Sequence, residues 1–197
     1  MPMLSIEHTT TAYRADFMLY GCAVAGLSAW LALRSPAGVG LQLSALVAAG
    51  LLGWSGLEYA LHRFVLHGLP PFKGWHREHH LRPTALICAP TWLSAALIGS
   101  LVWLPAMWWL GEWLGGALTL GVLIGYLGYA VTHHALHHWS AQNVWLQRRK
   151  YWHAKHHHLM QPCCFGVTNG VWDRVFRTAG HKHHSAPVRI PVRRHNG

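Results

Sequence analysis

Residues 41–67, LQLSALVAAGLLGWSGLEYALHRFVLH, decide the fold, because a long apolar run leads directly into histidine and arginine. The apolar part, 41–61, can cross the hydrocarbon core of a bilayer as one helix, which takes about 20 residues. Gly50, Gly53 and Gly56 recur every three residues, so a neighbouring helix can approach this side closely. The stretch predicts a membrane-spanning helix that ends in a cluster of ionisable side chains.

Three further apolar runs flank this one, at 17–33, 86–110 and 113–131. Pro36 stops the helix of the first run, and Pro90 predicts a kinked or re-entrant start for the third. Trp is abundant, at 12 residues, and several lie at the ends of runs, where interfacial aromatic residues are typical. The sequence therefore predicts an all-α integral membrane protein with four transmembrane helices and a cytosolic helical cap formed by residues 62–85 and 133–180.

The length of 197 residues fits a single domain, with polar tails at about 1–16 and 181–197. The first tail lacks the basic start and short apolar core of a signal peptide, so we expect the first run to remain in the mature protein. The four cysteines, which include the adjacent pair Cys163 and Cys164, show no metal-ligand spacing. We expect them to be reduced and structural.

The basic residues are distributed unevenly about the four runs. Of the 16 Lys and Arg residues, Arg34 is the single one on the side opposite the others. Because positively charged loops stay in the cytoplasm, we expect both termini and every histidine cluster on the cytosolic side. The formal charge of +10 does not indicate a nucleic-acid partner, since the basic residues border apolar segments, and anionic lipid head groups are the expected counter-charge.

Histidine is the most unusual feature of the composition, at 18 residues. Most of these residues form four clusters at the ends of the second and fourth runs or just beyond: His62 and His67; His76, His79 and His80; His133, His134, His137 and His138; His153, His156, His157 and His158. Residues at i, i+3 and i+4 share a helix face, so the rings of such a triad can point at one place. His62 and His67 are five apart, about 140° around an ideal helix at about 100° per residue. They could reach different metals or lie where the helix loosens.

About ten imidazoles exceed what one ion can hold, so the clusters predict two metal ions close together. An all-histidine ligand set carries no charge, and Glu58 and Asp173 are candidates for orienting the N–H groups of ligands from outside. The last two clusters also offer histidines one residue further along the chain, which could be the ligands if the helix faced the metals differently. These alternative ligands are His134, His138 and His158. The remaining histidines lie in the polar tails and are expected to be solvated: His8, His181, His183, His184 and His195.

Four motifs carry a resemblance to a known family: HRFVLH at 62–67, HREHH at 76–80, THHALHH at 132–138 and WHAKHH at 152–157. With FGVTNGVWDRVFRT at 165–178, they closely resemble the fatty acid hydroxylase and sterol desaturase superfamily of membrane non-haem di-metal oxygenases. The resemblance implies ten metal ligands: His62, His67, His76, His79, His80, His133, His137, His153, His156 and His157. It implies two iron ions as cofactor, and zinc, which imidazole also binds, can occupy the site in a purified sample.

Two features set this chain apart from other members of the superfamily. Cys164 stands directly before Phe165, where relatives commonly carry Asn. No fused haem-binding domain of the kind attached to some eukaryotic relatives is evident. The resemblance therefore implies that electrons come from a separate electron-transfer protein.

The function that the resemblance implies is O₂-dependent hydroxylation of a C–H bond in a membrane lipid, with a fatty acyl chain as the favoured substrate. Hydroxylation or desaturation of a sterol or carotenoid is the alternative within the superfamily. A membrane metal transporter or sensor is the alternative from another class. Transporters normally place polar ligands near mid-membrane, whereas the middles of these four runs hold no His, Asp or Glu, which favours the enzyme.

Overall fold

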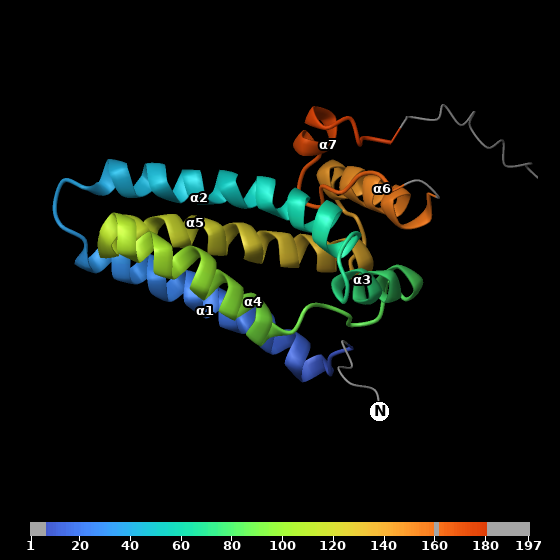
Figure 1. Cartoon of the computed structure of the whole chain (residues 1–197), viewed down its shortest axis with the longest axis horizontal. Coiled ribbons are helices and arrows are strands. Elements are labelled where there is room, and N and C mark those ends of the chain that lie inside the picture. The colour runs from blue at the N-terminus through green and yellow to red at the C-terminus, as the bar shows by residue number, and fades with distance from the viewer. Residues whose placement is uncertain (1–6, 160–161, 181–197) are drawn as a thin grey trace, which may run out of the picture.

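The computed structural model describes residues 7–159 and 162–180, and these ranges are helical, with one isolated β-bridge and no strand. The elements in chain order are α1 (Thr10–Arg34), α2 (Gly40–Ala60), the π-helix η1 (Leu61–Leu66), α3 (Phe72–Leu81), α4 (Thr91–Ile98), the π-helix η2 (Gly99–Trp103), α5 (Leu104–His138), α6 (Val144–His158) and α7 (Val171–Val175). The long helices lie side by side as a bundle, and α3, α6 and α7 gather at one of its ends (Figure 1). The predicted all-α class is confirmed.

Within residues 7–159 and 162–180, three helices are long and apolar enough to cross a membrane: Thr10–Arg34, Gly40–Leu66 and Thr91–His138. Their outer faces carry large apolar side chains in the open, such as Leu33, Leu52 and Trp108. A water-soluble monomer rarely exposes so much contiguous apolar surface. The bundle is therefore built for lipid surroundings, as the hydropathy of the sequence predicts.

The chain reverses direction inside the span Thr91–His138. Gly111 has φ 76° and ψ 177°, a conformation that interrupts the helix and that glycine adopts without strain. A Cβ on Gly115 would lie 2.5 Å from the carbonyl oxygen of Ala106, so the arms on either side of Gly111 press against each other. Figure 1 shows α4 running away from the end that carries α3 and α6, and α5 returning to it.

The closest approach between long helices joins α2 to α5. A Cβ added to Gly121 would lie 2.9 Å from the Cα of Gly50, so the two backbones meet where neither residue has a side chain. The predicted close packing is thus confirmed at Gly50. Gly56 instead faces the ring of Trp172, and Gly53 has nothing within 4 Å of its missing Cβ.

Two helix boundaries differ from the sequence prediction. The helix α1 begins at Thr10, capped by the Thr9 side chain, so it extends well before the predicted start at residue 17. The helix α4 begins only after Pro90, and residues 86–89 are not helical. The residue before a proline is disfavoured from the helical conformation, and Ile87 pairs with Glu7 in a β-bridge instead.

Candidate metal centre

The π-helix η1 explains how His62 and His67, five residues apart, serve one place. A π-helix closes hydrogen bonds between residues i and i+5, and the backbone N–H of His67 donates to the carbonyl of His62 at 3.2 Å. The two ring centroids are 5.3 Å apart. The helix therefore loosens where the spacing required it, and both rings face the interior of the cap.

The first histidine group consists of His62, His67, His76, His80 and His156, whose candidate ligand atoms all lie within 4.8 Å of one another. The Nε2 atoms of His62 and His76 are 2.9 Å apart, and those of His67 and His156 are 3.1 Å apart. Residues from η1, α3 and α6, distant in the sequence, thus converge on a single point.

The second histidine group consists of His79, His133, His137 and His153, again with candidate ligand atoms within 4.8 Å of one another. It joins α3, the last turns of α5, and α6. His157 lies between the two groups, because its Nε2 is 3.1 Å from that of His153 and its ring stacks on His80 with centroids 4.1 Å apart. The two groups are therefore immediate neighbours.

Backbone carbonyls fix the tautomers of two rings in the first group. His62 Nδ1 donates to the carbonyl oxygen of Phe165 at 2.6 Å, and His156 Nδ1 donates to that of Cys163 at 2.7 Å. A carbonyl can only accept, so each neutral ring carries its proton on Nδ1 and a free lone pair on Nε2. Those lone pairs face the middle of the group, as metal ligation requires.

The second group and the neighbouring His157 contain buried ring nitrogens that have no hydrogen-bond partner within the described residues. These are both nitrogens of His79 and the Nδ1 atoms of His153 and His157. An unpartnered buried polar group is costly and rare in folded proteins. A metal ion would satisfy the inner nitrogens, so the donor set fits metal ions.

Burial keeps the imidazoles of the two groups and of His157 neutral. Desolvation, with smaller contributions from neighbouring histidines, lowers the pKa of His79 to about 3 and the pKa of His157 to about 2. Desolvation also lowers the pKa of His156 to about 2, against the opposing hydrogen bond to Cys163. Neutral imidazole is the form that binds metals, so the rings need lose no proton before binding.

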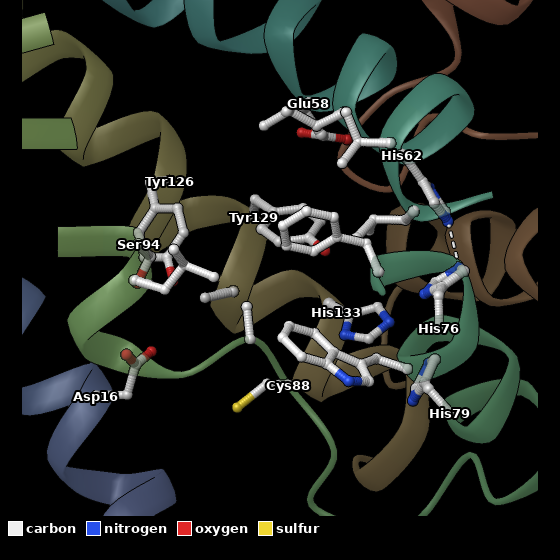
Figure 2. Close-up of a pocket in the computed structure, with 18 of the residues that line it drawn as sticks. Asp16, Glu58, His62, His76, His79, Cys88, Ser94, Tyr126, Tyr129 and His133 are labelled. Carbon is white, nitrogen blue, oxygen red and sulfur yellow. Dashed lines mark hydrogen bonds between the residues drawn. The ribbon is translucent and has the colours of Figure 1, made fainter. Parts of the chain in front are cut away.

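A cavity of about 240 Å³ extends from the histidines into the bundle. His62, His76, His79 and His133 line one end of it (Figure 2). The walls are mostly apolar and come from α1, α2, η1, α3, α4 and α5. The centre therefore opens onto a space that suits a hydrocarbon chain better than water.

The sequence of this chain matches the profile of the fatty acid hydroxylase family over residues 47–178. The chain belongs to the fatty acid hydroxylase family. The matched range contains all nine histidines of the two groups as well as His157, and it confirms the resemblance carried by the motifs. The two histidine groups, which could hold metal ions, thus belong to a member of a metal-dependent hydroxylase family.

Individual relatives agree with the family match. The chain is 32% identical to a dihydroceramide fatty acyl 2-hydroxylase of Arabidopsis thaliana over 80% of this chain and 68% of that protein. It is 33% identical to the fatty acid 2-hydroxylase of Homo sapiens over 66% of this chain but only 38% of the human protein. The structure of full-length scs7p, in which only the hydroxylase domain is visible, superposes with a TM-score of 0.76 at 25% identity, covering 89% of this chain and 69% of that one.

Two buried carboxylates were predicted to orient histidine N–H groups directly. They contact the backbone of residues 165–168 instead. Glu58 accepts hydrogen bonds from the backbone N–H groups of Val167 and Thr168 at 2.8 and 2.9 Å. Asp173 accepts from the N–H groups of Phe165 and Gly166, both at 2.9 Å. No hydrogen bond joins either carboxylate to a histidine among the described residues. They hold the segment whose carbonyls orient His62 and His156.

The carbonyl-bearing segment, residues 163–168, is the part of the site that sequence reasoning missed. The motif of this segment was recognised in the sequence. The sequence could not show which main-chain carbonyls accept hydrogen bonds, because every residue has one. Cys163 and Cys164 are buried and free of disulfide bonds. Cys164 has φ 59°, a left-handed conformation in which Asn is enriched, so Asn would suit this backbone position.

The alternative ligand candidates lie outside the two groups. His134 Nδ1 is 3.1 Å from the hydroxyl of Tyr13 on α1, and the His134 ring stacks on His138 with centroids 4.5 Å apart. His158, at the end of α6, is exposed. The register of α5 thus turns His133 and His137 inward.

The tail histidines divide between described and undescribed parts of the chain. His8 is half-buried rather than solvated, and its Nε2 has no partner among the described residues. The others lie outside the described residues: His181, His183, His184 and His195.

Proposed function

We propose that this chain is a membrane-bound di-iron oxygenase that hydroxylates a C–H bond in the acyl chain of a lipid, using O₂ and electrons from a separate protein. The observation that carries the proposal is the pair of adjacent histidine groups at one end of a mostly apolar cavity, in a member of the fatty acid hydroxylase family. The relatives described above are named for fatty acyl chains, which favours this substrate over a sterol or carotenoid.

Ten histidines would hold two iron ions: His62, His67, His76, His79, His80, His133, His137, His153, His156 and His157. Two groups of about five neutral rings match the capacity of two ions of the imidazole-binding transition metals. When bound, iron supplies the activation of O₂ and the removal of hydrogen from an unactivated carbon. Zinc in a purified sample would fill the same ligands without that chemistry.

The contribution of the chain itself is positioning and exclusion of water. The carbonyls of Phe165 and Cys163 hold two rings with their lone pairs inward. Glu58 and Asp173 accept hydrogen bonds from backbone N–H groups of residues 165–168 and so hold the segment in place. The apolar cavity walls hold an acyl chain extended toward the histidines. Exclusion of water by these walls protects a reactive oxidant from side reactions.

We further propose that the bundle crosses the membrane four times, with the metal centre and both termini in the cytosol. The reversal at Gly111 would divide the span Thr91–His138 into two crossings. The uneven distribution of Lys and Arg supports the sidedness. A centre at the cytosolic surface can take a lipid sideways from the bilayer and meet a soluble electron donor, and residues 1–197 would form one domain with polar tails.

Labelled oxygen gas tests the function. The purified, iron-loaded protein is supplied with a reductant, an electron-transfer protein and an N-acyl lipid under ¹⁸O₂, and the lipid is analysed by mass spectrometry. We expect one ¹⁸O atom in a hydroxyl group on the acyl chain. A new double bond without label would make the protein a desaturase, and oxygen derived from water would refute an oxygenase.

A further inference from the structure

The cavity ends inside the bundle, remote from the histidines. Figure 2 shows Ser94 and Tyr126 at this far end, across the cavity from His76 and His79. On α2, the first residue that lines the cavity is Trp54, eight residues before His62. At about 1.5 Å per helical residue, this spacing places Trp54 roughly 12 Å from His62 along the bundle. The tail of an acyl chain that extends from the histidines therefore meets the residues of this end.

One side of the far end is tied together by hydroxyl groups. The Tyr20 hydroxyl lies 2.8 Å from Ser94 Oγ, and Tyr126 also hydrogen-bonds to Ser94. Ser94 in turn donates to the backbone carbonyl of Thr91 at 3.0 Å. These bonds connect α1, α4 and α5, so this side cannot open for an acyl tail without losing them.

The other side of the far end is formed by the indole of Trp54. Trp54 is only 6% exposed, and its ring packs edge-on against Tyr126 with centroids 5.3 Å apart. Its Nε1 atom is buried without a hydrogen-bond partner among the described residues. A buried tryptophan usually finds a partner for this N–H group. The position therefore uses the bulk of the indole and not its polar atom.

Behind Trp54 lies an open apolar groove between α2 and α5, with the exposed side chain of Leu52 among its walls. Among the described residues, Trp54 is the single one that lines both the cavity and this groove. A Cβ added to Gly125, which also lines the groove, would lie 2.5 Å from Cγ of Trp54. The side chain of Trp54 is thus the partition between the two spaces.

We propose that Trp54 sets the length of the acyl chain that the cavity accepts, by closing its far end against the groove between α2 and α5. This inference rests on the proposed function, because it assigns the end of the cavity that would hold the acyl chain. A tail that reaches the indole can extend further only by displacing it, since hydrogen bonds tie the opposite side. A small residue at position 54 would join the cavity to the groove and give a longer tail an apolar place.

Equilibrium binding to the full-length chain in detergent tests the partition without requiring turnover. The probes are tritium-labelled N-acyl amino alcohols whose acyl chains lengthen in steps of two carbons. At each length the affinity of Trp54→Ala is divided by that of the wild type, so that partition of the probe into micelles cancels. We expect a ratio of about one or less for short chains. Beyond the wild-type length limit the ratio should rise to about tenfold or more, because overfilling a closed apolar space is strongly disfavoured.

Matched variants separate the partition from a general loosening of the bundle. Leu57→Ala also truncates a large side chain of α2, but Leu57 lines the groove and not the cavity, so it should keep the wild-type length limit. If Trp54→Ala fails to fold, as judged by gel filtration, Trp54→Phe and Trp54→Leu still give the reading, with the limit moving to longer chains as the side chain shrinks. An unchanged limit in the folded position-54 variants, or an equal shift in Leu57→Ala, overturns the partition.

A photoreactive probe locates the tail directly. A long N-acyl amino alcohol with a diazirine at the end of its acyl chain is bound and irradiated, and the labelled residues are mapped by mass spectrometry. In Trp54→Ala the label should reach residues of the groove such as Ile124, which it should not reach in the wild type. Labelling that stays outside the groove in both proteins would overturn the proposal.

Turnover distinguishes this inference from the function on which it rests. With acyl chains of increasing length under ¹⁸O₂, oxygen incorporation should end at a longer chain in Trp54→Ala than in the wild type. Hydroxylation with the same length limit in both proteins would overturn the partition and leave the function standing. A binding limit that moves with residue 54, without any oxygen incorporation, would uphold the partition and refute the function.

Discussion

The two histidine groups differ in how their rings are held. In the first group, the carbonyls of Phe165 and Cys163 fix His62 and His156, and buried carboxylates fix the segment that bears those carbonyls. In the second group, His79 and His153 keep ring nitrogens without partners among the described residues. One group is therefore pre-organised by the protein, whereas the other depends more on its metal.

The largest effect should come from removing a ring of the second group. His153→Ala should lose metal and at least about 100-fold in activity, because even the partners of ligands are worth about 10–100-fold in metal affinity. The fold should survive, since the ring is not tied to a carbonyl. Elemental analysis, turnover and gel filtration measure the three quantities.

His134→Ala is the control, because His134 lies on the same helix end as His133 but faces Tyr13. It should retain both metal and activity. A comparable loss of metal in His134→Ala would mean that the inward register of α5 has been assigned to the wrong pair of histidines.

Support of the first group can be weakened without touching a histidine. Glu58 accepts three hydrogen bonds, including one from the Thr168 hydroxyl at 2.6 Å. In Glu58→Gln the side-chain NH₂ group cannot accept, so we expect a loss of about 2 kcal/mol in the free energy of unfolding, typical for a buried charged hydrogen-bond acceptor. Thermal unfolding in detergent measures it.

Glu112→Gln is the matched control for this variant, because Glu112 is exposed near the Gly111 reversal, far from the histidines. It should change the melting temperature little. Equal destabilisation by the two variants would mean that charge in general, and not the hold on residues 167–168, sets the stability.

The sequence predicted the helical class, and it predicted that the clustered histidines would come together, because both leave local marks; that the ten bind metal stays a prediction. Apolar run length reports spans, and i, i+3, i+4 spacing reports a shared helix face. The π-helix at His62 to His67 was foreseen only as one of two possibilities. The first ring of this π-helix, His62, hydrogen-bonds to the carbonyl of Phe165, 103 residues away, and no local pattern encodes such a contact.

Other features could not be read from the sequence for similar reasons. Glu58 looked like a direct partner of a histidine because it lies one helical turn before His62. The structure instead turns its carboxylate toward the backbone of residues 167–168. The start of α4 was misplaced because apolar residues 86–89 looked like part of a membrane-spanning helix. They contribute to the cavity wall instead, where Ile87 is buried.

Low pH should destabilise the folded state through both histidine groups, although their rings are held differently. The folded pKa values of His79, His156 and His157, at about 3, 2 and 2, lie below the value of about 6.5 for an unfolded chain. The unfolded state therefore binds more protons below pH 6.5, so stability is fully present above that pH and falls as the pH decreases. The metal-free protein should melt roughly 10 °C lower at pH 5.5 than at pH 7.5, as several such rings together imply.

A variant sharpens this reading. In the metal-free His79→Gln protein, one ring that the fold must keep neutral is gone, so the difference in melting temperature between pH 5.5 and 7.5 should shrink. An undiminished difference would place the acid sensitivity outside the histidine groups.

The smallest expected effect concerns Cys164, which lies between the two carbonyls that anchor the first group. Its φ of 59° is uncommon for a residue with a Cβ, and Asn tolerates it best after glycine. The thiol takes little part in chemistry, because burial raises its pKa to about 12, and it accepts a weak hydrogen bond from Gly180 N–H at 3.3 Å. An Asn carbonyl can accept the same bond.

Cys164→Asn should therefore stabilise the protein by about 0.5 kcal/mol, a rise of roughly 1–2 °C in melting temperature. Cys164→Val should lower the melting temperature, because β-branched residues are strained at positive φ. If both variants lower the melting temperature equally, packing around the buried sulfur outweighs the backbone conformation, and the support of His62 and His156 is set by side-chain contacts.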